Sequence, residues 1–229
     1  SLTGGYIFKI DKTTGDNTEG WVGKGTNNYG ASIFYQYHYP EYTEMQKVQR
    51  TYIKNVMDNF ETVMAGKYYN DSVVGYIKYF DSTSFVNHTI ISELSRNLDA
   101  YRLSTYLNKN INSKGGGRLN AGPLWDYDLA YGMPNYCNAW LPNGWQIETT
   151  QDCSWNNPQW WTKMFRDVRF HNAMVRHWQK YRQGVLSYSH IEHIIDSAVL
   201  LLKGPQARNF QKWDILNTYV WPNYYIGNT

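Results

Sequence analysis

Three aspartates in two separate blocks of the sequence have the types and spacing best suited to chemistry. Asp99 lies within residues 97–102, and Asp126 and Asp128 lie within residues 122–132. Two positions that are two apart on a strand face the same side, and neighbouring carboxylates are ligands that Mg²⁺, Mn²⁺ or Ca²⁺ prefer. The alternative is a turn in which both aspartates cap local backbone groups. A metal site is favoured if Asp99 lies beside the pair.

Asp99 by itself has two interpretations. A carboxylate at the end of a helix commonly pairs with a nearby arginine, here Arg96 or Arg102, and such pairs are mostly structural. Alternatively, Asp99 is a base that accepts a hydroxyl proton during phosphoryl transfer, a reaction in which positioning and charge neutralisation supply most of the acceleration. The residues alone do not choose between these two roles.

The elements around the two blocks predict that the aspartates meet. Residues 101–107 and 118–124 each have the pattern of a strand, and the glycine-rich residues 114–117 form a turn between them. An antiparallel hairpin of this kind returns the chain to its starting point. We therefore expect the aspartate of the first block to face the two aspartates of the second.

The remaining sequence predicts a single, mainly helical α+β domain with small β-hairpins. Two more strands are expected at residues 5–11 and 32–39, with an irregular loop at 16–31 between them. Apolar residues that recur every three to four positions predict helices. These begin near the capping boxes Thr43–Gln46 and Ser189–Glu192, and near Asp81 or Ser82, Asn157 and Arg169.

Glycine and proline residues mark where the regular elements are expected to end. Gly66 should end the first long helix, and Gly204-Pro205 should end the last one, leaving at most a short helix before an aromatic tail. Residues 133–158 have no periodicity and predict a long ordered loop, of the sort that often shapes a site.

Composition and charge limit the classes of partner. The 229 residues can bury a substantial core. The net charge of +3, without a basic cluster, gives no argument for a nucleic acid partner. No apolar run approaches the roughly 18 residues of a membrane-spanning helix. The 21 Tyr and 10 Trp residues fit either an aromatic core or stacking against sugars or bases.

The two cysteines bear on the compartment. Cys137 and Cys153 flank part of the predicted loop at 133–158. A disulfide between them would be compatible with an exported or cell-surface protein. Two cysteines alone leave the bridged and the free forms both open.

The motifs taken together resemble the CotH family of spore coat protein kinases. Residues 92–107 and 121–132 carry the similarity, and residues 4–11 and Trp160-Trp161 also fit Bacteroides-type members of that family. The similarity extends through nearly the whole chain. The joint motif is much more specific than either acidic block by itself.

This resemblance implies an atypical protein kinase that transfers the ATP γ-phosphate to Ser or Thr of exported or surface proteins. Asp99 matches the catalytic-loop aspartate, and Asp126, assisted by Asp128, matches the aspartate that holds Mg²⁺ or Mn²⁺. Ser104 stands where an ordinary kinase catalytic loop has a metal-binding Asn. Ser104 and Arg102 are assigned to cofactor binding on the same basis.

The resemblance also implies a domain organisation. The family's domain begins upstream of the Gly4-Gly5-Tyr6 segment, with an amino-terminal lobe that helps to hold the nucleotide. We therefore expect residues 1–229 to correspond to the carboxy-terminal lobe alone. Weak ATP binding, or none, is expected unless another chain supplies the other lobe.

Two further classes of function remain open. One is a binding module of an exported protein, for a glycan or a protein, in which the acids are vestigial or bind Ca²⁺. Trp140 and Trp145 in the predicted loop would then carry the binding. The other is a structural scaffold without a ligand.

Overall fold

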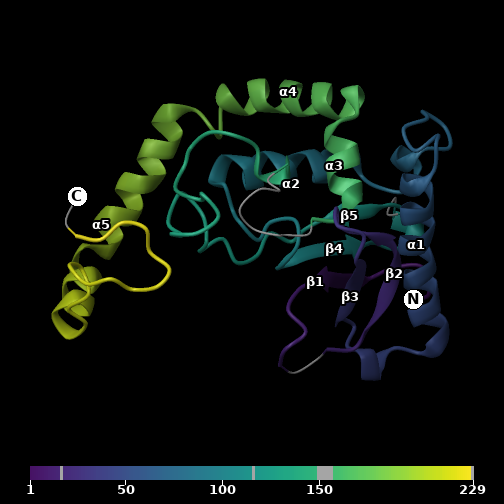
Figure 1. Cartoon of the computed structure of the whole chain (residues 1–229), viewed down its shortest axis with the longest axis horizontal. Coiled ribbons are helices and arrows are strands. Elements are labelled where there is room, and N and C mark those ends of the chain that lie inside the picture. Colours follow the sequence, from purple (N-terminus) through teal and green to yellow (C-terminus); the bar gives the residue numbers. More distant parts are fainter. Residues whose placement is uncertain (16–17, 115–116, 149–156, 228–229) are drawn as a thin grey trace.

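The computed structural model describes residues 1–15, 18–114, 117–148 and 157–227. One sheet lies at one end of the molecule, and the last helix lies at the opposite end (Figure 1). The strands are β1 (Tyr6–Ile10), β2 (Gly20–Thr26), β3 (Ser32–Tyr39), β4 (Thr105–Lys109) and β5 (Leu119–Ala121). The α-helices of the described residues are α1 (Lys47–Ala65), α2 (Ser82–Ser95), α3 (Gln159–Phe165), α4 (Val168–Arg182) and α5 (Tyr188–Lys212).

The strands form one antiparallel sheet with the order β2-β3-β1-β4-β5. Buried and less buried residues alternate along β1, as the two-residue period of a strand requires. The strands predicted at residues 5–11 and 32–39 are confirmed as β1 and β3. The predicted central hairpin is confirmed as β4 and β5, in which Leu107 lies opposite Ala121. The small hairpins therefore join into a single sheet.

Strand β2 corrects the prediction of an irregular loop at residues 16–31. Its glycine-rich sequence has a low strand propensity, but the segment pairs with β3 along one edge of the sheet. The buried Glu61 carboxylate accepts hydrogen bonds from the backbone N–H groups of Lys24 and Gly25, at 2.8 and 2.9 Å. A Cβ atom at Gly25 would lie 2.5 Å from a Glu61 oxygen. The glycines thus let a distant helix hold this strand.

The helices mostly begin where the sequence predicts. Asp81 caps α2, because its side chain accepts a hydrogen bond from the Ser84 N–H at 2.8 Å. Helix α1 follows a capping box of Gln46 and Gln49, one turn later than predicted. The residues before α1, Tyr42–Glu44, form a short 3-10 helix and are not part of the α-helix. Helices α3 and α4 confirm the two predictions near Asn157 and Arg169.

Aromatic rings form much of the core. The rings of Trp160 and Trp161 are 4.6 Å apart, and the rings of Phe85 and Trp161 are 5.2 Å apart. The imidazole of His88 stacks on Trp161 at 5.2 Å and is buried with it. The aromatic-core interpretation is therefore confirmed for these residues, while several other rings are exposed, including Trp125, Trp145 and Trp221.

Helix α5 differs from the prediction at both of its ends. It is capped by Ser187, whose side chain accepts a hydrogen bond from the His190 N–H, and not by Ser189. It continues through Gly204-Pro205 to Lys212. None of its residues is buried, so water can hydrate the carbonyl group that Pro205 leaves without a donor.

The fold is a mixed α/β structure, with five α-helices and a five-stranded sheet among the described residues. A helix both long enough and apolar enough to cross a membrane does not occur in the described part of the chain. The assignment to a kinase-like carboxy-terminal lobe stays a prediction.

Candidate active site

The two acidic blocks lie side by side, as the sequence predicts. The Leu98 N–H donates to the Leu129 carbonyl at 3.2 Å, and the Tyr131 N–H donates to the Ser95 carbonyl at 2.6 Å. The Asn97 side-chain amide also donates to the Asp126 carbonyl at 3.3 Å. These bonds hold the residues after α2 against the residues after β5.

The predicted hairpin connects the two acidic blocks, but its strands differ from the predicted ones. Residues 101–104 form a turn before β4, and residues 122–128 are irregular after β5, so both strands are shorter than predicted. Asp126 has a φ of 60°, in the left-handed region. The proximity of the Asp126 and Asp128 carboxylates is therefore produced by an irregular segment, not by the alternation of a strand.

Asp99 is largely buried and forms an ion pair with Arg102. Its backbone N–H donates to the Asn97 side-chain oxygen at 3.0 Å. Burial raises the pKa of Asp99; Arg102 and Lys12 lower that pKa, and Asp126 and Asp128 raise it. The ion pair with an arginine, which is one of the two interpretations of Asp99, is thus present. The negative charges of Asp126 and Asp128 also act on the Asp99 carboxylate.

Asp126 and Asp128 are exposed neighbours. Burial raises the pKa of Asp126, and its charge repulsion and hydrogen bonding with Asp128 raise that pKa further. Among the described residues neither aspartate forms an ion pair. Asp128 accepts a hydrogen bond from the Leu129 N–H at 2.8 Å, which is the local capping that the turn interpretation predicts.

Asp11 is a fourth acid at this site that the sequence reasoning missed. It follows the last residue of β1 and accepts a hydrogen bond from the Ser104 N–H at 3.4 Å. It also pairs with Lys9, with 2.8 Å between the Lys9 Nζ and a carboxylate oxygen. The pairing of Ile10 with Thr105 brings Asp11 to the site. Only a knowledge of that strand pairing would have revealed it.

The residues assigned to cofactor binding also lie at this site. The Ser104 hydroxyl donates to the Asp126 carboxylate at 3.4 Å. The Arg102 guanidinium contacts Asp99. Asp99, Arg102, Ser104, Asp126 and Asp128 are therefore brought together, and we call them, with Asp11, the acidic site.

The donor set of the acidic site can be compared with what a cation needs. Within the described ranges no group of three or more His, Cys, Asp or Glu side chains could by itself hold a metal ion. Asp126 and Asp128, with the Ser104 hydroxyl, provide a smaller set of hard oxygen donors. Mg²⁺ suits such a set, because it is usually bound by one or two carboxylates and keeps several waters and phosphate oxygens.

The loop after the acidic site packs against the tail of the chain. The rings of Tyr136 and Trp221 stack at 6.2 Å, and those of Trp140 and Tyr224 stack at 4.7 Å. Burial raises the pKa of Tyr136. The charges of Asp99 and Asp128 raise that pKa further, and the charge of Arg102 lowers it. Cys137 in this loop is disulfide-bonded; Cys153 lies outside the described residues.

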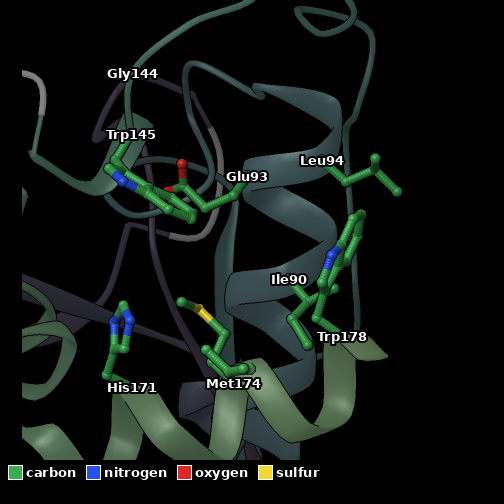
Figure 2. Close-up of a pocket in the computed structure, with 9 residues that line it drawn as sticks. Ile90, Glu93, Leu94, Gly144, Trp145, His171, Met174 and Trp178 are labelled. Atoms are coloured by element: carbon green, nitrogen blue, oxygen red, sulfur yellow. The ribbon is translucent and has the colours of Figure 1, made fainter. Parts of the chain in front are cut away.

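A separate apolar pocket lies between α2 and α4, and Figure 2 shows the residues that line it. Its volume is about 460 Å³. Trp145 forms one wall, and Glu93 contributes the carboxylate. Sequence reasoning singled out Trp145 but gave no indication of a pocket, because its walls come from three separate segments.

A family model described as CotH kinase protein matches residues 2–225. No curated protein matches the chain, and no solved structure matches it.

Proposed function

The chain belongs to the CotH kinase protein family, and from that membership we propose that it is a phosphotransferase of the protein kinase type. The reaction would transfer the γ-phosphate of ATP to a Ser or Thr hydroxyl of a protein. One observation carries the proposal: the acids that the family resemblance assigns to catalysis and metal binding lie in one site, although Asp99 is 27 residues from Asp126 and 29 from Asp128 in sequence.

In this proposal Asp99 accepts the proton of the attacking hydroxyl group. Burial raises its pKa, which makes it a better proton acceptor. The ion pair with Arg102 and the hydrogen bond from the Asp99 N–H to Asn97 hold it in one orientation. Both contacts support a positioned base, which is what phosphoryl transfer requires.

Asp126 and Asp128 would hold Mg²⁺ or Mn²⁺, with Ser104 as a weaker oxygen donor. The cation, when bound, would neutralise phosphate charge, which is the largest electrostatic demand of the reaction. The elevated pKa of Asp126, caused by burial and by Asp128, supports this role, because a cation relieves the repulsion between the two carboxylates.

Mn²⁺ binding followed by electron paramagnetic resonance tests the metal assignment. We expect Asp126→Asn to weaken Mn²⁺ binding by about tenfold or more, because the site loses one of its two charged ligands. Asp196→Asn, in exposed α5, is the matched control and should bind Mn²⁺ as the wild type does. Unchanged Mn²⁺ affinity in Asp126→Asn would contradict the assignment.

ATP binding and transfer test the role of Asp99. Calorimetry with ATP and Mn²⁺ on the full-length protein should give similar affinities for the wild type and Asp99→Asn. Phosphate transfer to a general Ser/Thr acceptor such as casein should fall by about 10²- to 10⁴-fold in Asp99→Asn, the usual contribution of a general base. Equal transfer rates would exclude Asp99 as that base.

A second candidate function is a binding module whose acids no longer catalyse. The Asp99–Arg102 ion pair favours it, because a carboxylate engaged by arginine can be purely structural. Of the two tryptophans assigned to glycan binding, Trp140 already stacks on Tyr224, whereas Trp145 is substantially exposed. Metal binding that is absent in the wild type, together with glycan binding lost in Trp145→Ala, would favour this module.

We also propose an exported or cell-surface location. The disulfide bond of Cys137 supports it, because disulfides persist mainly in oxidising compartments.

A further inference from the structure

We propose that the apolar pocket between α2 and α4 binds an acidic segment of a protein partner by receiving one large apolar side chain. This site is separate from the acidic site, and it does not depend on kinase activity. We call it the α2/α4 pocket. Ile90 and Leu94 of α2, Met174, Val175 and Trp178 of α4, and Trp145 of the preceding loop provide its apolar surface.

The size and lining of the α2/α4 pocket are those of a binding site. Its volume of about 460 Å³ lies within the range of about 300–1,000 Å³ that is usual for ligand pockets. Trp145 and Trp178 lie on opposite sides of the opening, with Met174 between them (Figure 2). Tryptophan and methionine are enriched in the cores of protein interfaces, where rings fill desolvated pockets.

Part of the apolar wall is open to solvent. Trp145 is 46% exposed, and Val175 and Trp178 are each 38% exposed. Hydrophobic side chains scattered singly over a surface need no explanation, but a contiguous apolar hollow marks an interaction site. An apolar side chain that fills the hollow would remove these surfaces from water at about 25 cal/mol per Å².

The pocket is also held in shape before anything binds. The Glu93 carboxylate accepts hydrogen bonds from the Tyr101 hydroxyl at 2.7 Å and from the N–H groups of Gln146 and Ile147 at 2.7 and 2.8 Å. These bonds fix the segment that begins with Trp145. A preformed site loses little conformational entropy on binding, which favours affinity.

Helix α4 is likewise fixed against α2 beside the pocket. The Tyr181 hydroxyl donates to the Asn87 side-chain oxygen at 2.7 Å, and His177 contacts the same oxygen at 3.3 Å. The wall that carries Met174, Val175 and Trp178 is thereby held at a constant distance from Ile90 and Leu94.

The charge around the pocket selects an acidic partner. The Glu93 carboxylate is already engaged by three hydrogen-bond donors, as described above. One of the four Arg or Lys residues of α4, Arg182, lies on the pocket face of the helix, and α4 contains no Asp or Glu. Arg96 adds a second positive charge at the rim, where its guanidinium donates to the carbonyl of the pocket-lining Gly144 at 2.9 Å. Arg182 continues the pocket-lining positions 171, 174, 175 and 178 along one helix face, and its guanidinium lies 5.7 Å from the Trp178 ring centre. Acidic residues beside the inserted side chain would meet this positive potential.

The shape of the pocket favours a peptide over a membrane surface. Basic residues with exposed apolar side chains also suit an anionic bilayer, but that contact needs apolar groups that protrude into the lipid. Here the apolar groups line a hollow. A hollow is filled by a side chain that the partner projects into it.

A fluorescein-labelled peptide, Gly-Asp-Asp-Phe-Asp-Asp-Gly, tests the proposal by fluorescence anisotropy with the full chain. We expect saturable binding that weakens by about tenfold or more in Trp178→Ala and in Val175→Glu. Val168→Glu is the matched control, because Val168 lies in the same helix, is 66% exposed and does not line the pocket. Arg182→Glu should weaken binding several-fold, and most strongly at low salt.

The controls define what would overturn the proposal. Peptides with Ser in place of Phe, or Lys in place of Asp, should not bind. The Asp126→Asn variant should bind the peptide as the wild type does, so failure of the kinase proposal would leave this one intact. Absence of saturable binding, equal affinity in Trp178→Ala and Val175→Glu, or Trp178-dependent binding to anionic phospholipid vesicles in place of the peptide would each refute the α2/α4 pocket as an acidic-peptide site.

Discussion

Single buried polar residues show how closely the interior of this protein is specified. His88 is buried against Trp161, and one of its ring nitrogens contacts the Ala100 carbonyl at 2.8 Å. That carbonyl belongs to the residue after Asp99, so the histidine helps to fix the backbone of the acidic site. A charged imidazole would be poorly solvated here, and burial lowers the pKa of His88 to about 4.

The pKa of His88 predicts a pH dependence of stability. Between about 4 and 6.5 the unfolded chain binds a proton at this residue that the folded chain does not, so the unfolding free energy should fall as the pH falls through this window. The contribution of His88 to this loss from pH 7 to pH 4 should be about 3 kcal/mol. Urea denaturation at both pH values measures it.

His88→Gln provides the control for that measurement. The buried carboxyl groups of Glu61 and Glu93 have pKa values raised by burial and contribute with the opposite sign, because they favour the folded state as the pH falls. The difference between wild type and variant removes their contribution. An equal pH dependence in both proteins would show that His88 does not titrate as stated.

Among the elements, the tail and the loop after the acidic site form a unit that neither could form alone. The Asn135 N–H donates to the Pro222 carbonyl at 2.7 Å, and the Tyr224 N–H donates to the Met133 carbonyl at 2.6 Å. The stacked rings of Trp221 and Tyr136 lie beside these bonds. The charges of Asp99 and Asp128 act on the hydroxyl group of Tyr136, so this side chain lies near the acidic site. The tail, which packs on Tyr136 through Trp221, therefore helps to hold that side of the site in place.

We expect Trp221→Ala to loosen this unit without unfolding the protein. Trp221 is exposed, so the global unfolding free energy should change by about 1 kcal/mol or less. Hydrogen exchange of the Asn135 and Tyr224 amides should become faster, because their bonds join the two segments. Trp213→Ala, an exposed tryptophan whose ring contacts Lys212, is the control and should leave both amides unchanged. Equal protection in Trp221→Ala would show that the ring stack contributes nothing.

At the scale of the whole molecule, stability is concentrated at one end. The main apolar core joins the sheet, α1, α2, α3 and α4, whereas α5 contains no buried residue and lies at the far side of Figure 1. Its apolar residues, including Leu200, Leu201 and Val199, are exposed. Helix α5 should therefore contribute little to the cooperative unfolding of the core.

Two substitutions to alanine test this distribution. Phe60 is fully buried, so Phe60→Ala should lower the unfolding free energy by about 3–5 kcal/mol. Leu201 is 77% exposed, so Leu201→Ala should change it by no more than about 0.5 kcal/mol. Urea denaturation followed by circular dichroism compares them. A similar decrease in the unfolding free energy for both variants would mean that α5 packs against the rest of the protein.

The sequence by itself determined the elements whose signals are local. The alternation of β1 and the cap of α2 at Asp81 depend on neighbouring residues, and both are where the sequence places them. The meeting of Asp99 with Asp126 and Asp128 was also predictable, because a hairpin joins their blocks.

The tertiary structure alone decided the features that depend on contacts between distant segments. Strand β2 has weak strand propensity and is held by Glu61 of α1. Asp11 reaches the acidic site only because β1 pairs with β4. Helix α5 passes its Gly204-Pro205 stop signal because solvent surrounds it. The α2/α4 pocket needs walls from three segments. Local patterns carry no record of such contacts, since their energies appear only when the chain has brought the segments together.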